Sequence, residues 1–319
     1  MTGVLDVLTV GRVGVDLYAQ ELHASFTEAR TFVKSVGGSP TNVAVAAARL
    51  GRRAAVFTKV GNDGLGAYVR HALAEEFDVD TAFVGTHPTL QTPIVVAVMD
   101  PPEDPQFVFY REPCAPDSTI LPDEVDMNVV QTVPILWVSA GALAVEPSRG
   151  TIREMLAERS RRPHTVLDLD YRRSFWSSED EARREIGAAI DVATIAVGNR
   201  AECEIAVGTS EPDAAADALL GRGVELAIVK MGGDGVLVAA DDERSRVPPV
   251  HVDVVSGLGA GDAFGGALCH SLLAGWTPVE AVEFANAAGA LVASRLLCAD
   301  AMPTEAEVRQ LMEAHRARR

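Results

Sequence analysis

The segment from Ser256 to Gly266 combines a glycine-rich turn with a carboxylate, in the order S-G-L-G-A-G-D-A-F-G-G. An apolar run typical of a strand ends before it, and an apolar helix is predicted to begin at about Gly261. Backbone N–H groups of Gly259, Ala260 and Gly261 would then point outward at a helix N-terminus, where the partial positive charge favours phosphate. A carboxylate repels phosphate, so Asp262 is better explained as a general base that accepts a hydroxyl proton during phosphoryl transfer. The alternative is an ordinary first-turn carboxylate, which the helix dipole also favours.

Paired glycines and an asparagine stand close together in the stretch G-G-S-P-T-N, from Gly37 to Asn42. Glycine lets the backbone approach a ligand closely, and the Asn42 side chain both donates and accepts hydrogen bonds, which suits a sugar hydroxyl. A plain turn before a helix with Pro40 in its first turn explains the same residues equally well.

Asn199 and Glu202 open a predicted helix after a strand that ends at Val197. An asparagine followed three residues later by glutamate resembles a capping box, which needs no further function. The alternative places both side chains at the carboxyl end of a parallel sheet, beside phosphates and a water-coordinated Mg²⁺.

A further glycine-rich stretch, K-M-G-G-D-G from Lys230 to Gly235, follows a predicted strand. Taken singly, it is more simply a tight hairpin. In the wall of a nucleotide site, Gly232, Gly233 and Gly235 would expose backbone to ribose and phosphate.

The chain lacks the motifs of two other nucleotide-binding classes. None of its lysines, Lys34, Lys59 and Lys230, follows a glycine, which excludes a Walker A loop. Asp262 stands where a G-x-G-x-x-G fingerprint would need its third glycine, so hydride transfer on a dinucleotide fold loses its main support.

These residues must be positioned by an alternation of β-branched runs and alanine-rich stretches, which is typical of a parallel sheet with crossover helices. We therefore expect an α/β fold, with one domain over residues 1–319. Strands are predicted over residues 4–11, 54–60, 135–139, 165–169, 192–197, 226–230, 235–240 and 246–254, and helices over 40–50, 65–77, 147–160, 199–207, 213–220, 261–274, 279–294 and 304–317.

Two insertions, at about 17–37 and 92–111, interrupt the alternation. Both have the pattern of strands with polar turns, and the second contains a sharp turn from Pro101 to Pro105. They are predicted to form a small antiparallel sheet, here called the lid. The open edges of such a sheet favour a homodimer in which a second subunit covers the lid.

The composition limits the classes of partner. The 319 residues include 28 Lys and Arg against 45 Asp and Glu, a net charge of −17. Nucleic acid and anionic membranes are bound by clustered Lys and Arg, so neither is an expected partner. Four widely spaced cysteines predict reduced thiols. The absence of a basic leader and of a long apolar run predicts a cytoplasmic protein.

The four stretches, in this order, resemble the phosphofructokinase B (ribokinase-like) family of carbohydrate kinases over essentially the whole chain. The resemblance implies a ribokinase-like fold, with ATP and Mg²⁺ as cofactors and a sugar as substrate. Within the family the chain is most similar to kinases of a keto-deoxy sugar acid of myo-inositol catabolism. The runs that carry this similarity are V-G-R-V-G-V-D-L-Y (10–18), K-S-V-G-G-S-P-T-N-V-A-V-A-A-A-R-L-G (34–51), F-Y-R-E-P (109–113), L-D-L-D-Y-R (167–172), V-G-N-R-A-E-C (197–203) and C-A-D-A-M-P-T (298–304).

The resemblance implies a role for each candidate residue. Asp262 would be the catalytic base, with the anion hole at its N-terminal side. Glu202 would hold Mg²⁺ through water. The other implied roles are Gly259, Ala260 and Gly261 in the anion hole, Asn199, Lys230, Gly232, Gly233, Gly235 and Asn286 beside the nucleotide, and Asp16, Gly38 and Asn42 at the substrate hydroxyls.

One departure from the family concerns K⁺. The family usually has Asp-Thr ahead of Gly-Ala-Gly-Asp, and that aspartate often helps to hold a monovalent cation. Ser256 and Gly257 stand there in this chain, so activation by K⁺ stays an open question.

Two arginines bear on the expected substrate. Arg111 ends the second lid insertion and Arg172 follows the predicted strand 165–169, and both places would face the sugar site. Arginine forms a planar fork matched to a carboxylate. In a chain with 25 arginines, an ordinary surface position is the alternative for each. The resemblance to kinases of keto-deoxy sugar acids favours carboxylate binding.

The resulting hypothesis is ATP-dependent phosphorylation of the 6-hydroxyl of 5-dehydro-2-deoxy-D-gluconate, with Asp262 as general base. A 2-keto-3-deoxygluconate kinase or a fructokinase of the same family is an alternative. A catalytically silent sugar or nucleotide sensor on the same fold is another.

Overall fold

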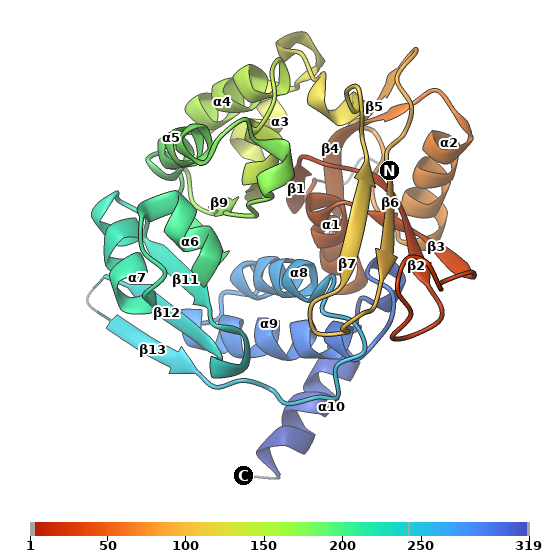
Figure 1. Cartoon of the computed structure of the whole chain (residues 1–319). Coiled ribbons are helices and arrows are strands. Elements are labelled where there is room, and N and C mark those ends of the chain that lie inside the picture. The colour runs from red at the N-terminus through yellow and green to blue at the C-terminus, as the bar shows by residue number, and fades with distance from the viewer. Residues whose placement is uncertain (1–3, 242, 318–319) are drawn as a thin grey trace.

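The alternation of strands and helices produces a large, mostly parallel sheet with helices on both faces, as the computed structural model shows (Figure 1). The structure describes residues 4–241 and 243–317. Within these residues the sheet has nine strands, in the order β13-β12-β11-β10-β9-β8-β1-β4-β5. Neighbours from β11 to β5 pair in parallel, and β12 and β13 form an antiparallel edge. The bounds are β1 (Val7–Val10), β4 (Ala54–Gly61), β5 (Val84–His87), β8 (Ile135–Ser139), β9 (Thr165–Asp168), β10 (Ile195–Asn199), β11 (Leu226–Lys230), β12 (Val236–Ala240) and β13 (Glu243–Val247).

Two hydrophobic cores lie on the two faces of this sheet. Side chains alternate between them: Trp137 of β8 belongs to the first core, and Leu136 and Val138 belong to the second. The helices of the first core are α1 (Ser39–Arg49), α2 (Gly64–His71), α8 (Ala260–Leu273), α9 (Pro278–Ala293) and α10 (Glu305–Arg316). Those of the second are α3 (Met127–Thr132), α4 (Ser148–Arg159), α5 (Glu179–Ile190), α6 (Arg200–Val207) and α7 (Pro212–Gly221).

The order of the strands reverses between β1 and β8. From β1 the sheet continues to β4 and β5 on one side, and from β8 it continues to β9, β10 and β11 on the other. In open parallel sheets a crevice forms outside the carboxyl ends of the strands at such a switch point. Val10 pairs with Val138, so Gly11 and Ser139 follow at the same edge of the sheet.

A small second sheet contains β2 (Gly14–Ala19), β3 (Phe32–Gly37), β6 (Ile94–Val98) and β7 (Gln106–Tyr110) in the order β3-β2-β6-β7. The prediction of a mostly parallel main sheet with a small separate sheet is confirmed. The prediction that the small sheet is antiparallel was wrong at its centre, because β2 and β6 pair in parallel. Both strands begin beside each other, where Val15 N donates to Pro93 O at 2.9 Å.

Some predicted elements also needed correction. The strand expected over 246–254 is β13, which ends at Val247 before Pro248 and Pro249. Proline has no N–H to donate to a strand ladder, which explains the early end. The sequence analysis missed α3, β5 and α5, although Ser178 caps α5 by accepting a hydrogen bond from Glu181 N at 3.1 Å. No helix within the described residues is long and apolar enough to cross a membrane.

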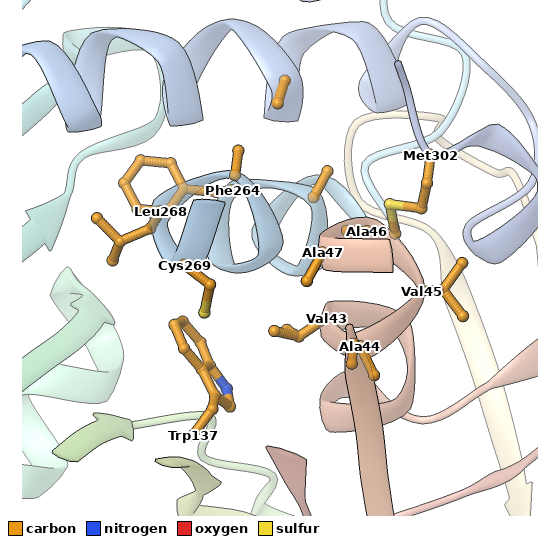
Figure 2. Close-up of a cluster of buried hydrophobic side chains, with 14 of the residues drawn as sticks. Val43, Ala44, Val45, Ala46, Ala47, Trp137, Phe264, Leu268, Cys269 and Met302 are labelled. Carbon is orange, nitrogen blue, oxygen red and sulfur yellow. The ribbon is translucent and has the colours of Figure 1, made fainter. Parts of the chain in front are cut away.

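Helices α1 and α8 approach closely because small residues lie between them. Figure 2 shows Ala46 and Ala47 of α1 beside α8. A methyl group on Gly266 of α8 would lie 2.3 Å from Ala46 Cβ and 2.7 Å from Ala47 N. The same two helices carry Asn42 and Asp262 near their N-terminal ends, so this packing sets the distance between two candidate site residues.

We expect Gly266→Ala to lower the free energy of unfolding by about 1–3 kcal/mol, because α1 and α8 must move apart to admit the methyl group. Gly221→Ala in α7 is the matched control, since its methyl group meets no atom within 4 Å. The control should be neutral or stabilising by up to about 1 kcal/mol. Urea unfolding compares the two variants, and equal stabilities would contradict the prediction.

Candidate active site

The strands of the main sheet bring the candidate residues to one edge. Asp168 at the end of β9 pairs with Ser139 of β8 and with Val197 of β10, and Asn199 pairs with Lys230 of β11. Because these strands are parallel and in register, the segments that follow them start side by side. Those segments carry Arg172, Glu202 and the loop from Lys230 to Gly235.

Asp262 and Asn42, which lie 220 positions apart in the sequence, are in direct contact. Asn42 Nδ2 donates a hydrogen bond to Asp262 Oδ2 at 2.8 Å. Burial raises the pKa of Asp262 to about 6, against the opposing effect of hydrogen bonds from Asn42 and Ser39. A carboxylate whose pKa lies near neutral pH is well matched to proton transfer. The geometry therefore equips Asp262 to accept a proton from a ligand hydroxyl.

The glycine-rich turn before Asp262 forms the start of α8. Gly259 caps the helix with a left-handed φ of 77°, and a methyl group on it would lie 2.6 Å from Cys298 Sγ. The first N–H groups of a helix have no carbonyl within the helix to donate to. The amides of Ala260 and Gly261 are thus available to an anion, and Lys230 borders them, since a methyl group on Gly261 would lie 3.4 Å from Lys230 Nζ.

Lys230 faces a group of carboxylates that includes Asp168. Burial lowers the pKa of Lys230, but Glu202, Asp168 and Asp262 more than offset this effect, so the pKa is raised. Burial also raises the pKa of Asp168 to about 8, and the carboxylates of Asp170 and Glu202 add to the shift, while Lys230 opposes it. The sequence analysis did not select Asp168, although two aspartates at the end of a predicted strand were a signal for it.

Asn199 and Glu202 form the capping box that their spacing predicts. Asn199 Oδ1 accepts from Glu202 N at 2.9 Å, and Glu202 Oε2 accepts from Asn199 N at 2.7 Å. The capping role of Asn199 and Glu202 is therefore present in the structure. It does not exclude a ligand, because Glu202 is buried beside Lys230 and Asp168 and only one of its oxygens serves the cap.

The lid places a second carboxylate beside Asp262. Asp16 of β2 accepts a hydrogen bond from Tyr18 Oη at 2.8 Å. Burial raises the pKa of Asp16 to about 6, with a further contribution from Asp262. Gly38 adjoins this region with φ 103°, and a methyl group on it would lie 2.3 Å from Arg12 O, so only glycine fits. Asn42 and Asp16 thus lie near Asp262, and Gly38 directly precedes α1, which carries Asn42.

Both candidate arginines are held by buried carboxylates. Arg111 forms an ion pair with Asp117, and Arg172 Nε lies 3.2 Å from Asp170 Oδ1. The positive charges of Arg12 and Arg172 lower the pKa of Asp170, against the effect of its burial. The sequence analysis missed Arg12, whose Nη2 donates to Asp170 Oδ2 at 2.6 Å. An arginine directly after the first strand was the available signal.

The candidate nucleotide residues flank the segment after β13. Gly235 has φ 88°, and a methyl group on it would lie 2.1 Å from Val247 O. Asn286 of α9 donates to Pro248 O at 2.9 Å. Gly232 and Gly233 are exposed in the turn after β11. Asn286 and the loop that follows Lys230 thus both contact the chain at Val247 and Pro248.

Comparisons with known proteins show the family to which this chain belongs. The family model described as pfkB family carbohydrate kinase matches residues 4–305. A 5-dehydro-2-deoxygluconokinase from Geobacillus kaustophilus is 30% identical, over 98% of this chain and 95% of the relative. Another, from Photobacterium profundum, is 34% identical, over 94% and 92%. The crystal structure of a fructokinase double mutant from Vibrio cholerae O395, with fructose, ADP and potassium ion bound, matches with a TM-score of 0.85 and 27% identity, over 97% of this chain and 98% of that one. The fold class expected from the sequence is confirmed.

We expect Asp262→Asn to raise the free energy of unfolding at pH 8 by up to about 3 kcal/mol. The pKa of Asp262 is raised from 3.8 to about 6 in the folded protein, so the native state holds its proton more firmly than the unfolded chain does. The destabilising effect of the ionised carboxylate is therefore absent below about pH 4 and complete above pH 6. Urea unfolding of both proteins at pH 8 and pH 4 measures it.

Asp253→Asn, at an exposed position outside the helices and strands, is the control and should change stability equally little at both pH values. An effect of Asp262→Asn that is the same at pH 4 and pH 8 would contradict the assignment.

Proposed function

Because this chain belongs to the pfkB family of carbohydrate kinases, we propose that it transfers the γ-phosphoryl group of ATP to the 6-hydroxyl of 5-dehydro-2-deoxy-D-gluconate. The observation that carries the proposal is the contact between Asn42 and Asp262, which places a proton acceptor beside the free amides of α8. The relatives named for this activity support the choice of substrate.

Asp262 accepts the hydroxyl proton as the hydroxyl oxygen attacks the γ-phosphorus in line. Asn42 donates to Oδ2 of Asp262, which orients the carboxylate toward the hydroxyl. The amides of Ala260 and Gly261, together with Lys230, stabilise the negative charge on the phosphoryl oxygens. No covalent intermediate with the enzyme is needed.

The carboxylates of Glu202 and Asp168, near Lys230, fit a magnesium ion. Among the described residues no group of three or more His, Cys, Asp or Glu side chains could hold a metal ion. Mg²⁺ in phosphoryl-transfer enzymes takes one or two carboxylates and completes its shell with water and phosphate oxygens. Glu202, through water, and Asp168 would hold it. Bound there, the ion would neutralise phosphate charge.

The lid is joined directly to the segment that precedes the anion hole. Gly257 N donates to Pro102 O, in the turn between β6 and β7, at 2.9 Å. A methyl group on Gly257 would lie 2.9 Å from Glu103 O, so the turn and the segment are in close contact. We propose that closure of the lid over the sugar moves the segment before the anion hole through this contact. Closure would also keep water from competing with the sugar hydroxyl as phosphoryl acceptor.

A coupled ATPase assay over a panel of sugar acids and sugars tests the function. We expect the highest kcat/KM with 5-dehydro-2-deoxy-D-gluconate, as the names of the relatives indicate, and lower values with 2-keto-3-deoxygluconate. Fructose should give the lowest value, because the arginines at the site favour a carboxylate. Higher kcat/KM with fructose than with either acid would identify a neutral-sugar kinase instead. No turnover with any of the panel would favour a sensor.

The same assay applied to Asp262→Asn tests the mechanism. We expect kcat to fall by about 10²–10⁴-fold, since the general base is lost, while ATP still binds in calorimetry. Turnover close to that of the wild type would disprove the role of Asp262.

We also propose that the chain forms a homodimer through the lid. The strands β3 and β7 are the edges of the small sheet, and the outward side chains Val108 and Tyr110 of β7 are 41% and 62% exposed. Phe32 of β3 adds a third exposed apolar group at 37%. Exposed apolar side chains on an open sheet edge favour association.

Analytical ultracentrifugation of Val108→Glu/Tyr110→Glu tests the dimer. We expect a monomer, whereas Leu121→Glu, at an equally exposed position outside the lid, should keep the state of the wild type. A wild-type protein that is monomeric at micromolar concentration would refute the dimer.

A further inference from the structure

Arg12 is a buried arginine with an unsatisfied donor. It follows β1, is only 7% exposed, and donates through Nη2 to Asp170 Oδ2 at 2.6 Å. Its Nη1 is buried and has no hydrogen-bond partner in the part of the chain that the structure describes. A buried charged donor without a partner is costly, and such groups in native proteins call for an explanation.

The residue that carries the unpaired nitrogen lines a pocket. Arg12 lines a cavity of about 130 Å³ together with Gly11, which follows β1, and Gly141, which follows β8. The cavity is therefore at the switch point of the main sheet, where open parallel sheets bind their ligands. A methyl group on Gly141 would lie 2.0 Å from Arg12 Nη1, so the absence of a side chain there makes room for the guanidinium.

Arg111 lines the same pocket from the lid. The guanidinium groups of Arg12 and Arg111 lie 4.9 and 5.3 Å from the ring centre of Phe175, which also lines the pocket. One aromatic ring thus holds two arginines in place beside one cavity.

Each arginine that lines the pocket already pairs with one buried carboxylate. Arg12 pairs with Asp170, which Arg172 also contacts, and Arg111 pairs with Asp117. Both carboxylates are occupied, because Asp117 also accepts from Val13 N and Asp170 also accepts from Ser139 Oγ. Glu112 borders the pocket as well, but it is exposed to solvent. A ligand carboxylate would supply the hydrogen-bond partner that Nη1 of Arg12 lacks among the described residues.

We propose that Arg12 binds the carboxylate of the sugar acid through Nη1, opposite Arg111, and so determines the preference for an acid over a neutral sugar. The inference rests on the proposed function and deepens it. Asp16 is a neighbour of both Arg12 and Asp262, whose charges both act on its carboxyl group. A substrate with its carboxylate at Arg12 can therefore extend past Asp16 toward the base.

Two substrates of the same shape separate carboxylate binding from a purely structural role. They are 5-dehydro-2-deoxy-D-gluconate and its primary amide, which lacks the charge. We expect Arg12→Met to raise KM for the acid by about 100-fold and KM for the amide by less than about threefold. Arg12→Lys keeps the charge without the fork and should recover part of the loss on the acid.

Arg149→Met is the matched control. Arg149 is buried to a similar degree and donates to Leu143 O and Ala144 O, near the same pocket, but does not line it. Its KM values for acid and amide should both stay within about threefold of the wild type.

Gly141→Ala is a second, independent variant, in case Arg12→Met does not fold. Its methyl group displaces Nη1 while the guanidinium remains, so we expect about tenfold weaker binding of the acid and no change for the amide. Equal losses on acid and amide in both variants, or an unchanged KM for the acid, would overturn the inference and leave Arg12 as a residue that positions Asp170.

Calorimetry without ATP distinguishes this inference from the proposed function. If the acid binds the wild type but is not phosphorylated when ATP is added, the proposed kinase activity is refuted. About 100-fold weaker binding of that acid to Arg12→Met would still support the role of Arg12 in binding the carboxylate. If neither this acid nor 2-keto-3-deoxygluconate binds the wild type, both fail.

Discussion

Helices α1 and α8 bring Asn42 to within 2.8 Å of Asp262 because glycine and alanine line the surface on which the two helices meet. The rest of the site depends on this contact. It joins the helix that follows the lid strand β3 to the helix whose first turn carries the free amides. A larger side chain at Gly266 would separate the proton acceptor from the residue that orients it, even though Gly266 touches no ligand.

The candidate site contains positively charged groups, although the chain as a whole is negatively charged. The protein has a net charge of −17, yet its proposed ligands are all anions. Attraction must therefore be local, and it comes from Lys230, the amides of α8 and the arginines around the pocket. The contrast between Asp168 and Asp170 shows how local this is. Both are buried, but the pKa of Asp168 is raised to about 8 among other carboxylates, whereas Arg12 and Arg172 lower that of Asp170.

The main sheet and the lid contribute different parts of the site. The parallel strands provide a fixed edge, and we propose that residues after β9, β10 and β11 at this edge bind phosphate and metal. The lid supplies Asp16 and Arg111 and touches the anion loop through Gly257. A sugar acid held between the sheet and the lid would contact rigid groups of the sheet at its reacting end. Its other end would contact groups that move with the lid. This division suits an enzyme that must admit its substrate and then exclude water.

Local patterns in the sequence determined most elements, the turn before Asp262 and the capping box of Asn199 and Glu202, because each depends on neighbours within a few positions. The family resemblance added roles for residues such as Asp16 and Asn286. Only the tertiary structure decided that β2 and β6 pair in parallel, that Asp168 joins Lys230 and Glu202, and that Arg12 meets Asp170. Arg12 and Asp170 lie 158 positions apart, and no local pattern records a contact between residues that only the packing of the sheet and its helices brings together. The unpaired nitrogen of Arg12 became visible for the same reason, since burial and missing partners are properties of the folded chain.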